Sequence, residues 1–148
     1  MTEKSAFNAE EWSKLAEAPA LAALRVIAAD RGGTIRESLS LGRAYAEARR
    51  DGSELLQEIV STAPQVDPNE LKDPGALPQR AQTALREALA LLEQKATPDE
   101  VAAYREFVLR VAETVARAHK EGGVLGIGGK EISENEQAAL DELAAAAR

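Results

Sequence analysis

The sequence contains no cysteine and only one histidine, His119. Without thiols the chain cannot form disulfides, iron–sulfur clusters, thiolate zinc sites or a cysteine nucleophile. One histidine without cysteine also falls short of the common zinc ligand sets. We expect His119 to have a structural role near the end of its helix, where a cationic or hydrogen-bonding residue suits the helix C-terminus.

Positive charge and long apolar runs are also scarce. The net charge is −7, the isoelectric point is near 4.9, and basic residues form no cluster larger than the pair Arg49 and Arg50. This charge argues against nucleic acid or an anionic membrane as a partner. The longest apolar stretch, residues 18–27, is interrupted by Arg25 and is too short to span a bilayer. The polar residues 1–5 do not resemble a signal peptide, so we expect a cytoplasmic protein whose partner, if it has one, is another protein.

Helix signals are abundant. Alanine, leucine and glutamate dominate the composition, and all three favour helices. Three stretches match the capping box, in which a Ser or Thr and a Glu three residues later bond each other's backbone N–H groups; they begin at Thr34, Thr97 and Ser133. Asn8 and Ser53 are also suited to cap helices. With apolar residues at helical spacing and no strand-like alternation, the sequence predicts an all-α protein.

We expect a compact irregular bundle of about seven helices. Their predicted ranges are 8–19, 19–30, 35–50, 54–62, 78–95, 97–120 and 133 to near the C-terminus. Pro19 is expected to end the first helix or begin the second, because proline is tolerated in a first turn but not in a helix interior. The second helix is apolar nearly all round, which predicts a central position. Its one charge, Arg25, should reach the surface or pair with a carboxylate.

The chain, residues 1–148, is predicted to be one domain in two helical halves. The halves cover about 8–62 and 78–147, and a proline-rich loop, residues 63–78, joins them. In the first half, Ser38, Gly42 and Ala46 share one helix face. Glycine costs roughly 1 kcal/mol in a helix interior relative to alanine. We therefore expect another helix to pack closely against Gly42.

Residues 122–130 form a glycine-rich segment that resembles a phosphate-binding loop only superficially. Val124 stands where the phosphate loop needs a glycine, and Glu131 stands where it needs Ser or Thr. We expect no nucleotide binding there. The apolar Val124, Leu125 and Ile127 have two interpretations: they dock into the core between the last two helices, or they contact a partner.

Five carboxylates flank the two glycine-rich breaks of the chain. They are Asp30, Glu37, Glu131, Glu134 and Glu136. If the two halves pack side by side, these groups could converge on a divalent cation, the one cofactor that the sequence leaves open. The alternative is that they are first-turn carboxylates that interact with helix dipoles.

The two breaks resemble the TerB-like, tellurite-resistance family of small helical proteins. Residues 129–136, with Gly129, Ile132, Ser133 and Glu136, are similar to part of that family's Ala-Asp-Gly-x-Ile-x-x-x-Glu pattern, and residues 29–35 are similar to another part. The resemblance implies a stress-associated helical module with a metal site. The opening Trp12-x-x-Leu15-x-x-Ala18-Pro19 is similar to that of helical bacterial proteins, which implies no activity.

These observations lead to one expectation and two alternatives. We expect a non-enzymatic binding or interaction module, with no organic cofactor. The first alternative is a divalent-metal-binding stress-response module, as the resemblance implies. The second is an enzyme that works through carboxylates alone.

Overall fold

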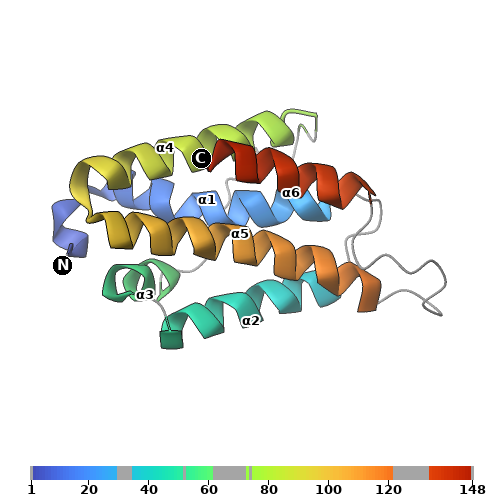
Figure 1. Cartoon of the computed structure of the whole chain (residues 1–148), viewed down its shortest axis with the longest axis horizontal. Helices are drawn as coiled ribbons and strands as arrows, with labels where there is room; N and C mark the ends of the chain where they lie inside the picture. Colours follow the sequence, from blue (N-terminus) through green and yellow to red (C-terminus); the bar gives the residue numbers. More distant parts are fainter. Residues whose placement is uncertain are drawn as a thin grey trace.

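The computed structural model describes residues 2–29, 35–51, 53–61, 73, 75–121 and 134–147, and at residues 35–41, 51 and 118–121 only the helical backbone is described. Within these ranges the chain forms six α-helices, one short 3-10 helix and no strand (Figure 1). The all-α prediction is confirmed, with one helix fewer than expected. The helices, in chain order, are η1 (Lys4–Ala6), α1 (Ala9–Ile27), α2 (Ile35–Asp51), α3 (Glu54–Ser61), α4 (Leu77–Lys95), α5 (Pro98–Glu121) and α6 (Glu134–Ala146).

Local capping signals set where three helices begin. The Asn8 side chain accepts a hydrogen bond from the Glu11 N–H at 2.8 Å, and Glu11 bonds back to the Asn8 N–H. Thr97 and Glu100 form the same reciprocal pair at the start of α5. The Ser53 hydroxyl accepts from the backbone N–H of the third residue along at 3.2 Å. These caps are confirmed because each depends only on residues three apart.

Helix α1 lies at the centre of the bundle, as its apolar sequence predicts. It packs mainly against α4 and α5 and also contacts α6 and α3 (Figure 1). Its Leu15, Leu21 and Val26 are fully buried in a core to which every α-helix contributes. Its Arg25 pairs with Glu142 of α6, with the carboxylate accepting from both Nε and Nη2 at about 3 Å. The expected carboxylate partner is thus confirmed.

Pro19 does not divide α1, and this accounts for the missing helix. A proline inside a helix has no N–H to bond the carbonyl four residues earlier, which here belongs to Leu15. The hydroxyl of Tyr104 on α5 donates to that carbonyl at 2.8 Å. Tyr104 is 1% exposed and Leu15 is fully buried, so the bond satisfies a polar group that water does not reach. The prediction of a break at Pro19 is wrong because a distant side chain replaces the missing donor.

The expected close helix crossing at Gly42 is also wrong. Gly42 is exposed, and a Cβ atom added to it would lie within 4 Å of no described atom beyond its chain neighbours and the backbone of its own helix. The buried face of α2 instead includes Ala44 and Tyr45. Helix periodicity placed Gly42 on a possible packing face, but only the direction in which α2 approaches its neighbours decides which face is buried.

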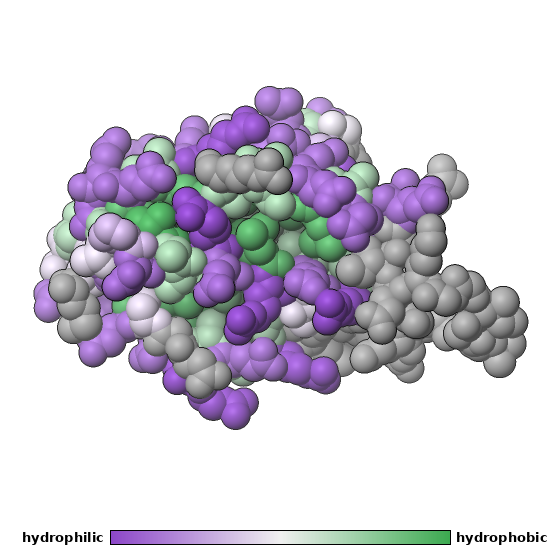
Figure 2. All heavy atoms as spheres, viewed as in Figure 1, coloured by the Kyte–Doolittle hydropathy of each residue, from purple (hydrophilic) through white to green (hydrophobic). Residues whose placement is uncertain are grey.

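The described residues on the face seen in Figure 2 are mostly charged and polar, with apolar surface visible between α5 and α6. The partly buried Leu109 on α5 and Leu140 on α6 belong to the apolar residues packed against the core. Within the ranges that the structure describes, none of the helices combines the length and apolar character needed to cross a bilayer.

We predict that Tyr104→Phe lowers the free energy of unfolding by roughly 1–3 kcal/mol, because it leaves the buried Leu15 carbonyl without a donor. Tyr45→Phe is the matched control, since the Tyr45 hydroxyl is buried and has no hydrogen-bond partner among the described residues. Its removal should leave stability unchanged or raise it. Urea unfolding followed by circular dichroism measures both, and equal stabilities of the two variants would contradict the role given to Tyr104.

We predict that Gly42→Ala raises the free energy of unfolding by about 0.5–1 kcal/mol, because alanine is the better helix former. The open space around Gly42 accepts the added methyl group. Thermal unfolding checks this, and a lower melting temperature would show that another element crowds this side of α2.

Candidate functional site

A hollow lies on the surface where α2, α3 and α5 meet, and we call it the α2–α3–α5 hollow. Its volume is about 320 Å³, at the lower end of the range for small-ligand pockets. Helix α2 packs on both α5 and α3 (Figure 1). The position of the hollow therefore depends on the contacts that hold α2 against these two helices. The lining residues are Ala44, Glu47 and Ala48 of α2, Ser53 and Leu56 at the start of α3, and Ala103, Glu106, Phe107 and Arg110 of α5.

The floor of the hollow is apolar and built from small side chains. Ala44 and Ala48 are four residues apart on α2, and Ala103 and Phe107 are four residues apart on α5. Residues at this spacing share one helix face. Three of these four side chains end at Cβ, so the two facing helices leave space that neither fills.

Phe107 is the large residue of the floor, and Tyr45 supports it from α2. The two rings meet edge to face, with centroids 5.2 Å apart and an interplanar angle of 69°, a favourable arrangement for aromatic pairs. Tyr45 is 5% exposed, and burial raises the pKa of its hydroxyl well above the usual value. The hydroxyl therefore stays protonated. The floor ring is held in place by packing before any ligand arrives.

Three charged side chains surround the apolar floor. Glu47 on one wall and Glu106 and Arg110 on the other are all exposed. In the part of the chain that the structure describes, none of the three takes part in an ion pair or hydrogen bond. The rim of the hollow thus offers two carboxylates and one guanidinium to an incoming group.

The polar groups that line the hollow are two carboxylates, one guanidinium and one hydroxyl. Two carboxyl groups whose pKa is lowered, Glu11 and Glu100, lie elsewhere in the fold. The one hydroxyl at the rim, on Ser53, already serves as a helix cap.

A second depression, of about 690 Å³, lies beside α3 on the side of η1. Its lining is entirely polar: Lys4, Glu54, Gln57, Glu58 and Ser61. It has no apolar floor on which a partner could gain burial energy. The α2–α3–α5 hollow is therefore the better candidate site.

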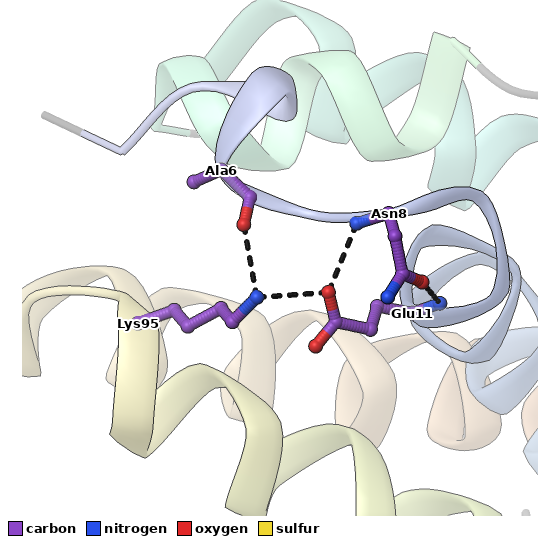
Figure 3. Close-up of polar contacts among 4 residues, drawn as sticks. All are labelled: Ala6, Asn8, Glu11 and Lys95. Carbon is purple, nitrogen blue, oxygen red and sulfur yellow. Dashed lines mark hydrogen bonds and ion pairs between the residues drawn. The ribbon is translucent and has the colours of Figure 1, made fainter.

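A dense polar network lies near the N-terminus, and we call it the N-terminal clamp: Thr2, Asn8, Glu11, Lys95 and Glu100. The Lys95 ammonium at the end of α4 donates to the Ala6 carbonyl at 3.0 Å and to Glu11 Oε1 at 2.8 Å (Figure 3). That same carboxylate oxygen accepts from the Asn8 N–H. The hydrogen bond from Lys95, followed by that from Asn8, lowers the pKa of Glu11.

Glu100 forms the second half of the clamp. Its carboxylate accepts hydrogen bonds from the Thr2 hydroxyl at 2.7 Å, from the Thr2 N–H at 3.2 Å and from the Thr97 N–H at 3.0 Å. Burial raises the pKa of Glu100, but these hydrogen bonds outweigh burial and leave the pKa below its usual value.

Two cation–π contacts complete this region. The Lys4 ammonium lies 5.2 Å from the centre of the Trp12 ring, and the Lys95 ammonium lies 5.6 Å from that of Phe7. The two aromatic rings pack on each other. Since the charges of the clamp are engaged within the chain, its role is to fasten residues 2–8 to the turn between α4 and α5.

The predicted metal site lies mostly outside the described residues. Asp30 and Glu131 fall outside, and the side chain of Glu37 is not described. Glu134 is exposed and Glu136 is 2% exposed, both in the first turn of α6. Among the described residues, no group of three or more His, Cys, Asp or Glu side chains is placed to hold a metal ion. The metal site therefore stays a prediction.

The predicted partner-binding residues Val124, Leu125 and Ile127 also lie outside the described residues, so their two interpretations stay open. Sequence reasoning did not find the α2–α3–α5 hollow. Two features of the sequence could have indicated it: the alanine pair Ala44 and Ala48, and the presence of Tyr45 and Phe107 in a chain with few aromatic residues. Neither signal indicates which helices face each other.

Comparison with protein-family models, with curated proteins and with solved structures gives no match.

We predict that the N-terminal clamp loosens under acidic conditions. A carboxyl group whose folded pKa is below its unfolded pKa stabilises the fold above the unfolded pKa, and this contribution is lost as the pH falls through the folded pKa. The pKa values of Glu11 and Glu100 are both lowered from 4.5. The clamp should therefore persist at neutral pH and open below about pH 4.5, which the fluorescence of Trp12, the only tryptophan, can follow.

The control for this titration is a pair of isosteric variants. Glu100→Gln should show a weaker fluorescence change between neutral and acidic pH than the parent, because part of the titrating contribution is gone. Glu93→Gln, at an exposed position on α4, should titrate like the parent. A Glu100→Gln titration identical to that of the parent would contradict the assignment.

Proposed function

We propose that this chain is a non-enzymatic binding module that docks a partner protein in the α2–α3–α5 hollow. The observation that carries the proposal is an apolar floor surrounded by charged side chains that have no partner within the described part of the chain. Interaction sites typically combine an apolar centre with a polar rim. In contrast, the clamp combines similar residue types but uses its charges internally.

Docking in the hollow would remove apolar surface from water. The floor combines the buried Ala44 and Phe107 with the half-buried Ala48 and Ala103. An apolar side chain placed there would be transferred out of water at about 25 cal/mol per Å² of buried apolar surface. The Tyr45–Phe107 packing keeps the floor ordered beforehand, which reduces the entropy cost of binding.

No observation on the described residues supports either of the two alternative functions, a metal-binding module or a carboxylate-based enzyme. The carboxylates of the metal-binding module lie mostly outside them, and the TerB-like resemblance stays a prediction. A carboxylate-based enzyme would need a titratable group with a raised pKa in a concave site. The sequence predicts a cytoplasmic protein, and we therefore propose that the partner is also found in the cytoplasm.

We predict that Ala48→Trp abolishes capture of the partner. The indole would extend from the partly buried Ala48 position into the hollow and fill it. Affinity capture from lysate of the native cells, with the parent and Ala48→Trp as baits, measures this. Ala90→Trp, at an exposed position on α4, is the control and should capture the same proteins as the parent.

Thermal unfolding of each bait establishes that the variant is folded. Ala103→Trp blocks the hollow from the opposite wall and replaces Ala48→Trp if that variant unfolds. A partner captured equally well by the parent and by both blocking variants would show that docking occurs elsewhere.

A further inference from the structure

The charges at the rim of the α2–α3–α5 hollow indicate the sign of the charge that a partner should carry. Glu47 on α2 and Glu106 on α5 stand on opposite walls, and Arg110 lies one turn beyond Glu106 on the same helix. The rim therefore has an excess of one negative charge. The whole chain carries a net charge of −7, so the long-range field also favours a basic group at this face.

Glu106 and Arg110 would be expected to pair with each other. A Glu four residues before an Arg on a helix is the favourable order for an ion pair, and α5 contains such a pair elsewhere: Glu113 and Arg117 meet at 2.5 Å. Glu106 and Arg110 have the same spacing but form no ion pair within the described part of the chain. The carboxylates at the rim are thus available to a basic group from outside.

The shape of the hollow indicates a helical guest. It lies between two helices, and each contributes floor residues four apart: Ala44 and Ala48 on α2, Ala103 and Phe107 on α5. Rows of side chains at this spacing form the ridges and grooves through which helices pack. A volume of about 320 Å³ suits a few apolar side chains rather than an extended apolar ligand.

We infer that the occupant is a short amphipathic helix of another protein, with a large apolar side chain inserted over Phe107 and Lys or Arg side chains beside it facing Glu47 and Glu106. This inference rests on the proposed function and specifies its partner. Recognition of an amphipathic helix in an apolar groove is a common mode of peptide binding. The apolar residue supplies the burial, and the flanking bases select this groove by charge.

The test uses two synthetic helical peptides of about four turns, each with leucines four residues apart on one face. One carries Lys beside the leucines, and its twin carries Glu at the same positions. Binding of each labelled peptide to the full chain is measured by fluorescence anisotropy. We expect saturable micromolar binding of the Lys peptide, at least about tenfold weaker binding of the Glu twin, and weaker Lys-peptide binding at high salt because exposed charges are screened.

Charge-neutral variants identify the groups responsible. Glu47→Gln combined with Glu106→Gln should weaken binding of the Lys peptide about tenfold, and both changes are at exposed positions. Glu113→Gln removes an exposed carboxylate from the same helix outside the hollow and should leave binding unchanged.

The possible failures are distinguishable. If both peptides bind equally and Ala48→Trp abolishes both, the basic-helix inference is overturned while the proposed function stands. If the Lys peptide binds but Ala48→Trp and Ala103→Trp do not weaken its binding, the peptide binds outside the hollow. The inference is then overturned, and the capture experiment judges the proposed function. If neither peptide binds, the inference is overturned and the capture experiment alone judges the proposed function. If the chain itself dimerises in sedimentation and Ala48→Trp abolishes the dimer, the occupant is a second copy and the inference is again overturned.

Discussion

The hydrogen bond from the Tyr104 hydroxyl to the Leu15 carbonyl allows the centre of this bundle to be one unbroken helix. Pro19 removes the donor that a helix interior normally supplies to that carbonyl, and an unsatisfied buried carbonyl would cost roughly 1–3 kcal/mol. Tyr104 supplies the donor from α5. The full length of α1 can therefore pack against α4 and α5, and the bond also links α1 to α5 at a defined position.

Helix α5 connects this central layer to the peripheral pair α2 and α3. One side of α5 packs on α1, while α2 packs on α5 and α3. Two contacts hold the pair: Tyr45 meets Phe107 edge to face, and the Arg49 guanidinium donates to the Val60 carbonyl at the end of α3. Small side chains of α2 and α5 line the space between the two helices at the hollow, and close packing is incomplete there. The α2–α3–α5 hollow is thus a consequence of placing alanines where two helices meet.

The N-terminal clamp and the hollow show two uses of the same residue types. In the clamp, Glu11 and Glu100 bind donors of the chain itself, and their lowered pKa values reflect those bonds. At the hollow, Glu47 and Glu106 have no such donors in the described part of the chain. Charges that a fold uses internally contribute to its stability, whereas charges left at the edge of an apolar surface are available for recognition. This contrast, more than the volume of the hollow, is the basis for proposing a docking role.

The amino-acid sequence by itself determined the features that depend on short chain separations. The all-α class, the caps at Asn8, Ser53 and Thr97, and the central position of the apolar helix all follow from residues within a few turns of one another. The carboxylate partner of Arg25 was expected in kind but not in identity. The continuity of α1, the exposed position of Gly42 and the existence of the hollow were decided only by the tertiary structure. Each depends on which side of one helix meets another. Helical periodicity defines the faces of a helix but does not specify which helix packs against each face. The hydrogen-bond donor for the Leu15 carbonyl, for example, lies 89 residues away along the chain.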